Sequence, residues 1–256
     1  MYMDSPVYSP QTWGEGDARA GTLLFGGVNQ SKYNGTLHTL PIVDSPDGLR
    51  RAYRVNVTGL SIDETSISAK NFPTQAVFDS SLPYTYVPVS IARNIFSEFG
   101  ITEIPTSGQI SVPCNSTSRN TTMTFQFGAA QFKLNIGLFI HTESLFGQAD
   151  HDKEMCYFGV VANTDAYDAD STVLGSNFLQ QVYTVYDMGN HEISLAERDW
   201  DSIGDEILEI TTGKNAVPGA TSEEDDTEKS LGSHIGEGTG LRLSLAIFVV
   251  WALFCW

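Results

Sequence analysis

Apolar and polar positions alternate along much of the first 198 residues, in short runs separated by Gly, Asn and Pro. Residues 51–62 (RAYRVNVTGLSI) alternate with a period of two, which is typical of a half-buried strand. Residues 21–28 and 35–42 predict two strands around a turn, and strand patterns return in GQISVPC, MTFQFG, QFKLNIGLFI, CYFGVVAN and TVLG. The pattern therefore predicts a mainly β domain over residues 20–198.

One segment changes to a helical period. Between Pro88 and Phe99 the apolar residues fall on one helical face, and Gly100 follows as a carboxyl cap. A shorter helical stretch, FLQQ, precedes the runs YTVYD and EISLA, which flank a turn at residues 188–190. We expect one or two short helices and a hairpin near the end of the domain.

The carboxyl-terminal part is acidic and then apolar. Ten acids lie among Ser, Thr and Gly in residues 199–230, so residues 199–240 are predicted to be a disordered stalk. The tail, residues 241–256, ends in an apolar run of about 14 residues, or roughly 21 Å of helix, which is short of the about 20 residues that span a bilayer. Small residues, a polar spacer and an apolar end match a glycosylphosphatidylinositol signal, with candidate attachment sites Ser230, Gly232 and Ser233. A short tail anchor is the alternative.

The composition and the sequence motifs limit the possible partners and the cellular location of the protein. The formal net charge is -17, which argues against a nucleic-acid partner. Cys255 lies in the tail, which leaves Cys114 and Cys156 as a disulfide or as two buried thiols. Five Asn-X-Ser/Thr acceptors favour the secretory route and the extracellular face of the plasma membrane or the cell wall; they are Asn29, Asn34, Asn56, Asn115 and Asn120. The first ten residues, MYMDSPVYSP, do not form a signal peptide, so either export is wrong or an amino-terminal part is missing.

Most catalytic chemistries lack their motifs in this sequence. His141 and His151 lie near several acids but without a metal-binding spacing, and neither a GxSxG motif nor a phosphate-binding glycine loop occurs. We therefore expect no metal and no cofactor. Asp79 differs, because AVFDSSLPYTYVP places it at the end of an apolar strand. It is either a turn former or an acid held where its protonation can be tuned.

Four segments in order carry a resemblance that bears on Asp79. They are LLFGGVNQSKYNGTLHTLPI, AVFDSSLPYTYVP with its following helix, the Cys114 and Cys156 pair, and VLGSNFLQQVYTVYDMGNHEISLAE. Together they resemble the carboxyl-terminal lobe of pepsin-like aspartic proteases, most closely the membrane-anchored fungal yapsin-type members. The resemblance covers about residues 20–198. Residues 1–19 are then expected to be a remnant of the segment between the two lobes.

The resemblance implies a two-lobed endopeptidase in which each lobe supplies one aspartate. Asp79 is the expected catalytic residue here, with Ser80 and Ser81 beside it, and the strand Val173-Leu174-Gly175 is expected to thread its turn. Two adjacent carboxylates share one proton, and the ionised one activates the water that attacks a peptide bond of a polypeptide substrate.

The sequence departs from the family pattern in two ways. Neither Asp-Thr-Gly nor Asp-Ser-Gly occurs, so the printed chain is expected to lack the amino-terminal lobe and to be inactive alone. Ser81 replaces a glycine, and Leu82 replaces a Ser or Thr whose hydroxyl would bond the carboxylate, a loss of roughly 1.5–3 kcal/mol. The alternative function is therefore a catalytically dead cell-surface interaction or scaffold protein. A symmetric dimer that supplies two copies of Asp79 is a third possibility.

Overall fold

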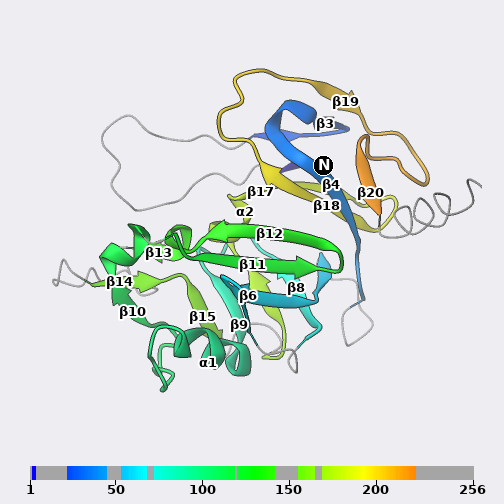
Figure 1. Ribbon diagram of the computed structural model, residues 1–256. Coiled ribbons are helices and arrows are strands. Elements are labelled where there is room, and N and C mark those ends of the chain that lie inside the picture. Colours follow the sequence, from blue (N-terminus) through cyan, green and yellow to red (C-terminus); the bar gives the residue numbers. More distant parts are fainter. Residues whose placement is uncertain are drawn as a thin grey trace, which may run out of the picture. The chain divides into compact units, whose positions relative to one another are not determined.

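The computed structural model describes residues 2–3, 22–44, 53–67, 72–118, 120–141, 155–164 and 169–222. All of them belong to one compact unit, Met1–Glu223. Short strands make up most of this unit, with two α-helices in the described part, so the mainly β prediction is confirmed (Figure 1).

A five-stranded sheet lies at the centre of the largest apolar cluster. Its order is β15-β9-β16-β8-β5. The strands are β15 Val160–Asn163, β9 Thr85–Pro88, β16 Thr172–Leu174, β8 Thr74–Phe78 and β5 Arg54–Val57. Strands β9, β15 and β16 are buried at every position, because both faces of the sheet are covered.

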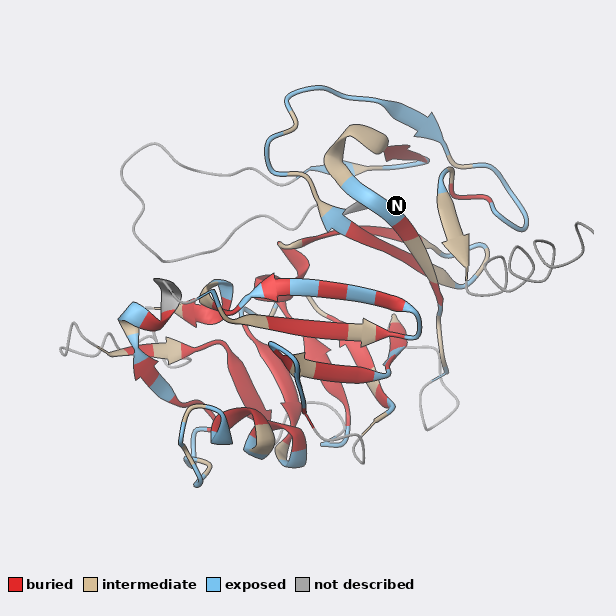
Figure 2. Cartoon of the chain, in the orientation of Figure 1, coloured by how far each residue is buried: buried red, intermediate tan, exposed pale blue. Residues whose placement is uncertain are grey.

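Two smaller sheets cover this core. One has the order β12-β11-β6-β7 and the other β10-β14-β13. Their strands are β12 Ala130–Asn135, β11 Thr122–Phe127, β6 Gly59–Ile62, β7 Thr65–Ser66, β10 Ser111–Pro113, β14 Met155–Phe158 and β13 Ile140–His141. Burial alternates along β12, as expected of a strand with one wet face (Figure 2). Inside, the ring centroids of Phe125 and Phe178 lie 5.0 Å apart.

A six-stranded sheet is covered on both faces. Its order is β2-β1-β17-β18-β4-β20. Its strands are β2 Leu23–Leu24, β1 Tyr2–Met3, β17 Val182–Asp187, β18 Glu192–Arg198, β4 Tyr33–Pro41 and β20 Ala220–Ser222. Leu195 packs into the main core, whereas its neighbour Ala196 packs into a second cluster with Val28, Leu37 and Tyr183. Strands β17 and β18 form the predicted hairpin.

The helices follow the predicted pattern. Helix α1, Val89–Ser97, buries its apolar face in the main core. The turn after it closes at Gly100, which has a φ of 74°. The Gly100 amide bonds the Ser97 carbonyl at 2.9 Å, and the next amide bonds the Phe96 carbonyl at 3.0 Å. Helix α2 is Ser176–Leu179, and the 3₁₀ helices are η1 Gln30–Lys32, η3 Cys114–Ser118 and η4 Ile136–Phe139.

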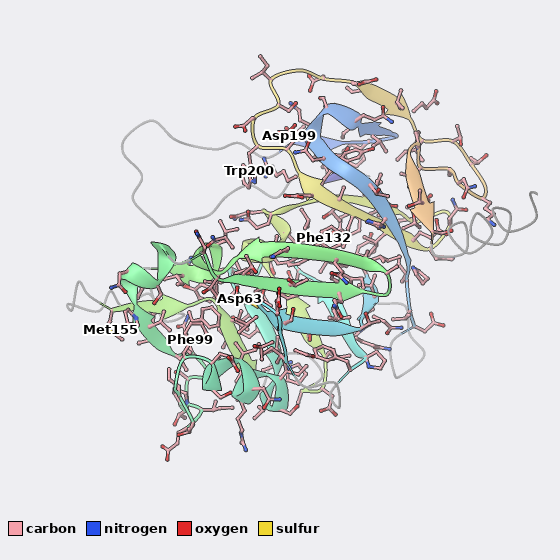
Figure 3. The ribbon with its side chains drawn as sticks, viewed as in Figure 1. Asp63, Phe99, Phe132, Met155, Asp199 and Trp200 are labelled. Carbon is pink, nitrogen blue, oxygen red and sulfur yellow. A yellow bond between two sulfur atoms is a disulfide. The ribbon has the colours of Figure 1, made fainter. Side chains whose placement is uncertain are left out.

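The predicted disordered stalk is wrong for residues 199–222. This segment begins at Asp199 and Trp200, which follow β18 (Figure 3). Its strand β19, Ile207–Glu209, pairs with β3, Gly27–Asn29, and β20 adds a parallel strand beside β4. The prediction was based on the high proportion of acidic residues in the segment. A few of its apolar residues nevertheless pack on the second cluster, and its backbone forms hydrogen bonds with the edges of neighbouring strands. Residues 223–240 of the predicted stalk lie outside the described residues.

Asn29 fixes this segment to the lobe. Its side-chain amide donates to Asp205 at 2.7 Å, its side-chain oxygen accepts from the Glu206 amide at 2.9 Å, and its backbone amide donates to the Tyr183 hydroxyl at 2.7 Å. Lys32 adds an ion pair of 3.5 Å with Asp205. The bond from Asn29 and then the charge of Lys32 hold the pKa of the Asp205 carboxyl below its usual value.

Candidate active site

Asp79 follows directly on β8 and is half-buried. Its backbone amide donates to the Leu174 carbonyl at 3.1 Å, so the residue is bonded to the end of β16. The sequence placed Asp79 at a strand end, and the structure adds that a second strand lies against it.

Strand β16 runs between the two strands that the Asp79 turn connects. It pairs in parallel with β8, with Val173 opposite Val77, and antiparallel with β9, with Val173 opposite Tyr86. The turn from β8 to β9 therefore closes around the end of β16. The expected threading by residues 173–175 is present in the structure.

Gly175 is where this threading is tightest. A methyl group at Gly175 would overlap the carbonyl oxygen of Tyr84 and lie 2.8 Å from that of Leu82. Its φ of -82° is ordinary, so glycine is needed here for space and not for conformation. In the sequence, this position is recognisable as the glycine that follows the apolar pair Val173 and Leu174.

Two serines hold the turn in place. The backbone amide and the hydroxyl of Ser81 both donate to Oδ1 of Asp79, at 2.9 and 2.6 Å. Behind the turn, the Ser176 hydroxyl reaches the carbonyls of Ser80 and Leu82 at 2.9 and 3.1 Å, and the Ser176 amide bonds Leu82 at 2.8 Å. Ser176 was missed in the sequence, because only the threaded geometry brings it to a turn almost a hundred residues away.

Two tyrosines also lie near Asp79. The Tyr53 carbonyl accepts the amide of Phe78 at 3.3 Å, and the Tyr53 and Tyr186 rings lie 4.8 Å apart. Burial raises the pKa of Tyr186, and the neighbouring Tyr53 and the charge of Asp79 raise it further. Neither tyrosine follows from the sequence, since β17 and the segment before β5 meet only in the fold.

A polar cluster packs against Tyr84, which lies in the same turn. The Thr85 hydroxyl donates to the Asn177 side chain at 2.8 Å, and that side chain donates to the Gly159 carbonyl at 2.8 Å. His141 lies beside them with its ring centroid 5.1 Å from that of Tyr84, and its buried Nε2 has no partner among the described residues. Burial lowers the pKa of His141 to about 4.

The other predicted sites that lie within the described residues divide into three groups. Cys114 and Cys156 form the disulfide, with their Cα atoms 4.8 Å apart. Asn34, Asn56, Asn115 and Asn120 are exposed, as glycan acceptors must be. Asn29 is only 6% exposed, and its amide nitrogen already bonds Asp205, so the folded chain does not present this acceptor to solvent.

The attachment candidates Ser230, Gly232 and Ser233 and the apolar tail lie outside the described residues. Within the part that the structure describes, we find no helix that is both long and apolar enough to span a membrane.

Comparison with known proteins shows the family to which the chain belongs. A family model described as eukaryotic aspartyl protease matches residues 1–198. The chain belongs to this family. The family match ends at β18, before the segment 199–222.

Fungal members of the aspartyl protease family are similar over most of the chain. A probable aspartic-type endopeptidase, opsB, of Aspergillus oryzae is 35% identical over 88% of this chain and 45% of its own length. Aspartic proteinase 3 of Saccharomyces cerevisiae is 32% identical over 80% of this chain and 35% of its own length. Candidapepsin of Candida tropicalis is 32% identical over 74% and 42%, respectively. The chain therefore spans less than half the length of these relatives.

Proposed function

We propose that this chain is part of an aspartic-type endopeptidase and supplies one of its two catalytic carboxylates, Asp79. The observation that carries the proposal is the turn closed around β16, which presents Asp79 on a support held by Ser176 and Gly175. The names of the relatives support peptide-bond hydrolysis as the reaction.

In the proposed mechanism Asp79 works with a second carboxylate from an amino-terminal lobe that the printed sequence does not include. Two carboxyl groups that share one proton let the ionised group take a proton from water while the other donates a hydrogen bond to the carbonyl oxygen under attack. A polypeptide is the substrate, and the reaction needs no cofactor. Because the proposed exchange needs the second carboxylate of the amino-terminal lobe, the 256-residue chain by itself is expected to be inactive.

The test uses the full-length protein, that is, the printed sequence together with any residues that the gene encodes before Met1. We expect it to contain an Asp-Thr-Gly or Asp-Ser-Gly turn and to cleave a peptide at acid pH. Asp79→Asn should lower kcat at least a thousandfold, because the dyad loses its exchangeable proton. Asp201→Asn is the matched control, since Asp201 is an exposed carboxylate after β18.

The outcomes of this test distinguish an active endopeptidase from an inactive interaction or scaffold protein. Full activity in Asp79→Asn would exclude Asp79 as the catalytic carboxylate. A folded longer protein that has both turns but cleaves nothing would favour the inactive interaction or scaffold protein, for which the replaced residues Ser81 and Leu82 are the supporting observation.

The same proposal includes a secreted, surface-held protein. The disulfide and the four exposed acceptors, Asn34, Asn56, Asn115 and Asn120, support passage through the secretory route. We propose a lipid anchor near Ser230, Gly232 or Ser233, with the apolar tail removed. Phosphatidylinositol-specific phospholipase should release the protein from cell membranes, whereas a mature protein that keeps residues 243–256 would exclude this anchor.

A further inference from the structure

The turn that carries Asp79 has a hydroxyl where the family pattern has a glycine. Ser81 donates its hydroxyl to Oδ1 of Asp79 at 2.6 Å and its backbone amide to the same oxygen at 2.9 Å. A hydroxyl-to-oxygen distance of about 2.5–2.7 Å is typical of a bond to an ionised carboxylate. The geometry is therefore that of a donor that favours the charged form of Asp79.

The neighbouring position shows why this donor matters. Leu82 has no hydroxyl, and its side chain packs with Tyr84, Tyr86 and Val173 instead of reaching the carboxylate. From the sequence we expected the turn to lose a hydrogen bond here and to be mistuned. In the structure a hydroxyl bonds the carboxylate, but from the residue before.

The backbone accepts a side chain at position 81. The described non-glycine residues with positive φ are Asp63, His191 and Asn215, so Ser81 has a backbone conformation open to any L-residue. Removing its hydroxyl therefore should not strain the turn.

We propose that Ser81 is a positioning residue that takes over the hydroxyl role lost at Leu82 and stabilises the ionised carboxylate of Asp79. The proposal rests on the proposed function, in which Asp79 is the catalytic carboxylate. It removes one reason to regard the altered turn as inactive, because the departure at Ser81 compensates for the departure at Leu82.

The titratable groups that the described residues place near this turn from other elements include two phenols and an imidazole. Tyr186 comes from β17, and Tyr53 precedes β5 and stacks on Tyr186. A phenol stays neutral in the acid range, but His141 of β13 packs on Tyr84 of this turn and has a pKa lowered by burial to about 4. The Asp79→Asn variant is therefore needed to separate the titration of Asp79 from that of His141.

The experiment is a ¹³C-carboxyl NMR titration of the 256-residue chain, with Asp79→Asn to assign the signal. Ser81→Ala is expected to raise the proton affinity of Asp79 about tenfold, since it removes a hydrogen bond to the charged form. Ser81→Thr retains the hydroxyl and should stay within twofold of the wild type. Ser90→Ala, at an exposed serine on α1, is the matched control and should also stay within twofold.

Two results would overturn the proposal: an affinity within twofold of the wild type in Ser81→Ala, or an equal change in Ser81→Thr. If Ser81→Ala does not fold, Ser81→Gly provides a second variant without the hydroxyl and has the family's own residue. The titration needs no catalysis, so its failure is distinct from failure of the activity test with Asp79→Asn.

Discussion

Acidification should destabilise this lobe through His141. Burial lowers its pKa from 6.5 to about 4, so between these values the unfolded chain binds a proton that the folded chain does not. Stability attributable to this group is therefore complete above pH 6.5 and is lost as the pH falls toward 4. The difference in pKa corresponds to a loss of about 3 kcal/mol in the free energy of unfolding at pH 4.

His141→Leu removes this titration with a side chain of similar volume. We would measure urea unfolding of the 256-residue chain at pH 7, 5.5 and 4 for the wild type, for His141→Leu and for His191→Asn. His191 is an exposed control with a φ of 58°, a conformation that asparagine tolerates. Carboxylates contribute equally to all three proteins, so the differences between them isolate the histidine.

Between pH 7 and pH 4, the free energy of unfolding of the wild type and of His191→Asn should fall by about 3 kcal/mol more than that of His141→Leu. Parallel pH dependence of wild type and His141→Leu, within about 0.5 kcal/mol, would show that His141 is not held neutral by burial and would refute the reasoning.

Three further changes test the support of the site. Gly175→Ala should destabilise by about 3 kcal/mol or more in urea unfolding, because its methyl group overlaps a backbone carbonyl, whereas Gly204→Ala, with open space around it, should change little; equal effects would contradict the steric argument. Cys114→Ser, which frees Cys156, should cost about 4 kcal/mol because it opens a loop with a separation of 42 residues, and an unchanged urea midpoint would contradict this. Asn29→Ala should speed hydrogen exchange at the β19 amides and leave α1 protected, and unchanged exchange at β19 would show that Asn29 does not anchor the segment.

Local patterns in the sequence were sufficient for much of the lobe. Helix α1 with its closing turn at Gly100, the hairpin of β17 and β18, and the alternating strand β12 each depend on neighbours within a few residues. The order of segments along the chain was also enough to predict the strand that is threaded behind Asp79. These features are readable because side-chain periodicity and capping are set by local geometry.

Other features depend on contacts between distant parts of the chain. The hydrogen bond from the Ser81 hydroxyl to Asp79 could not be predicted from the sequence, although the two residues are near neighbours. The direction of a side chain in a turn depends on the strands that pack against that turn. Ser176 and Tyr186 reach the turn only through the threaded strand and β17. Segment 199–222 becomes ordered only against edges that other strands provide.

The sequence by itself determined the class of fold and the acid at the end of a strand, and it left Cys114 and Cys156 as either a disulfide or two buried thiols. The tertiary structure decided that these cysteines are bonded, how that acid is held, which histidine is buried and how residues 199–222 pair with other strands. The physical reason is that hydrophobic period and turn chemistry act over a few residues, whereas hydrogen-bond partners and burial are set by strands that are distant in the chain and adjacent in space.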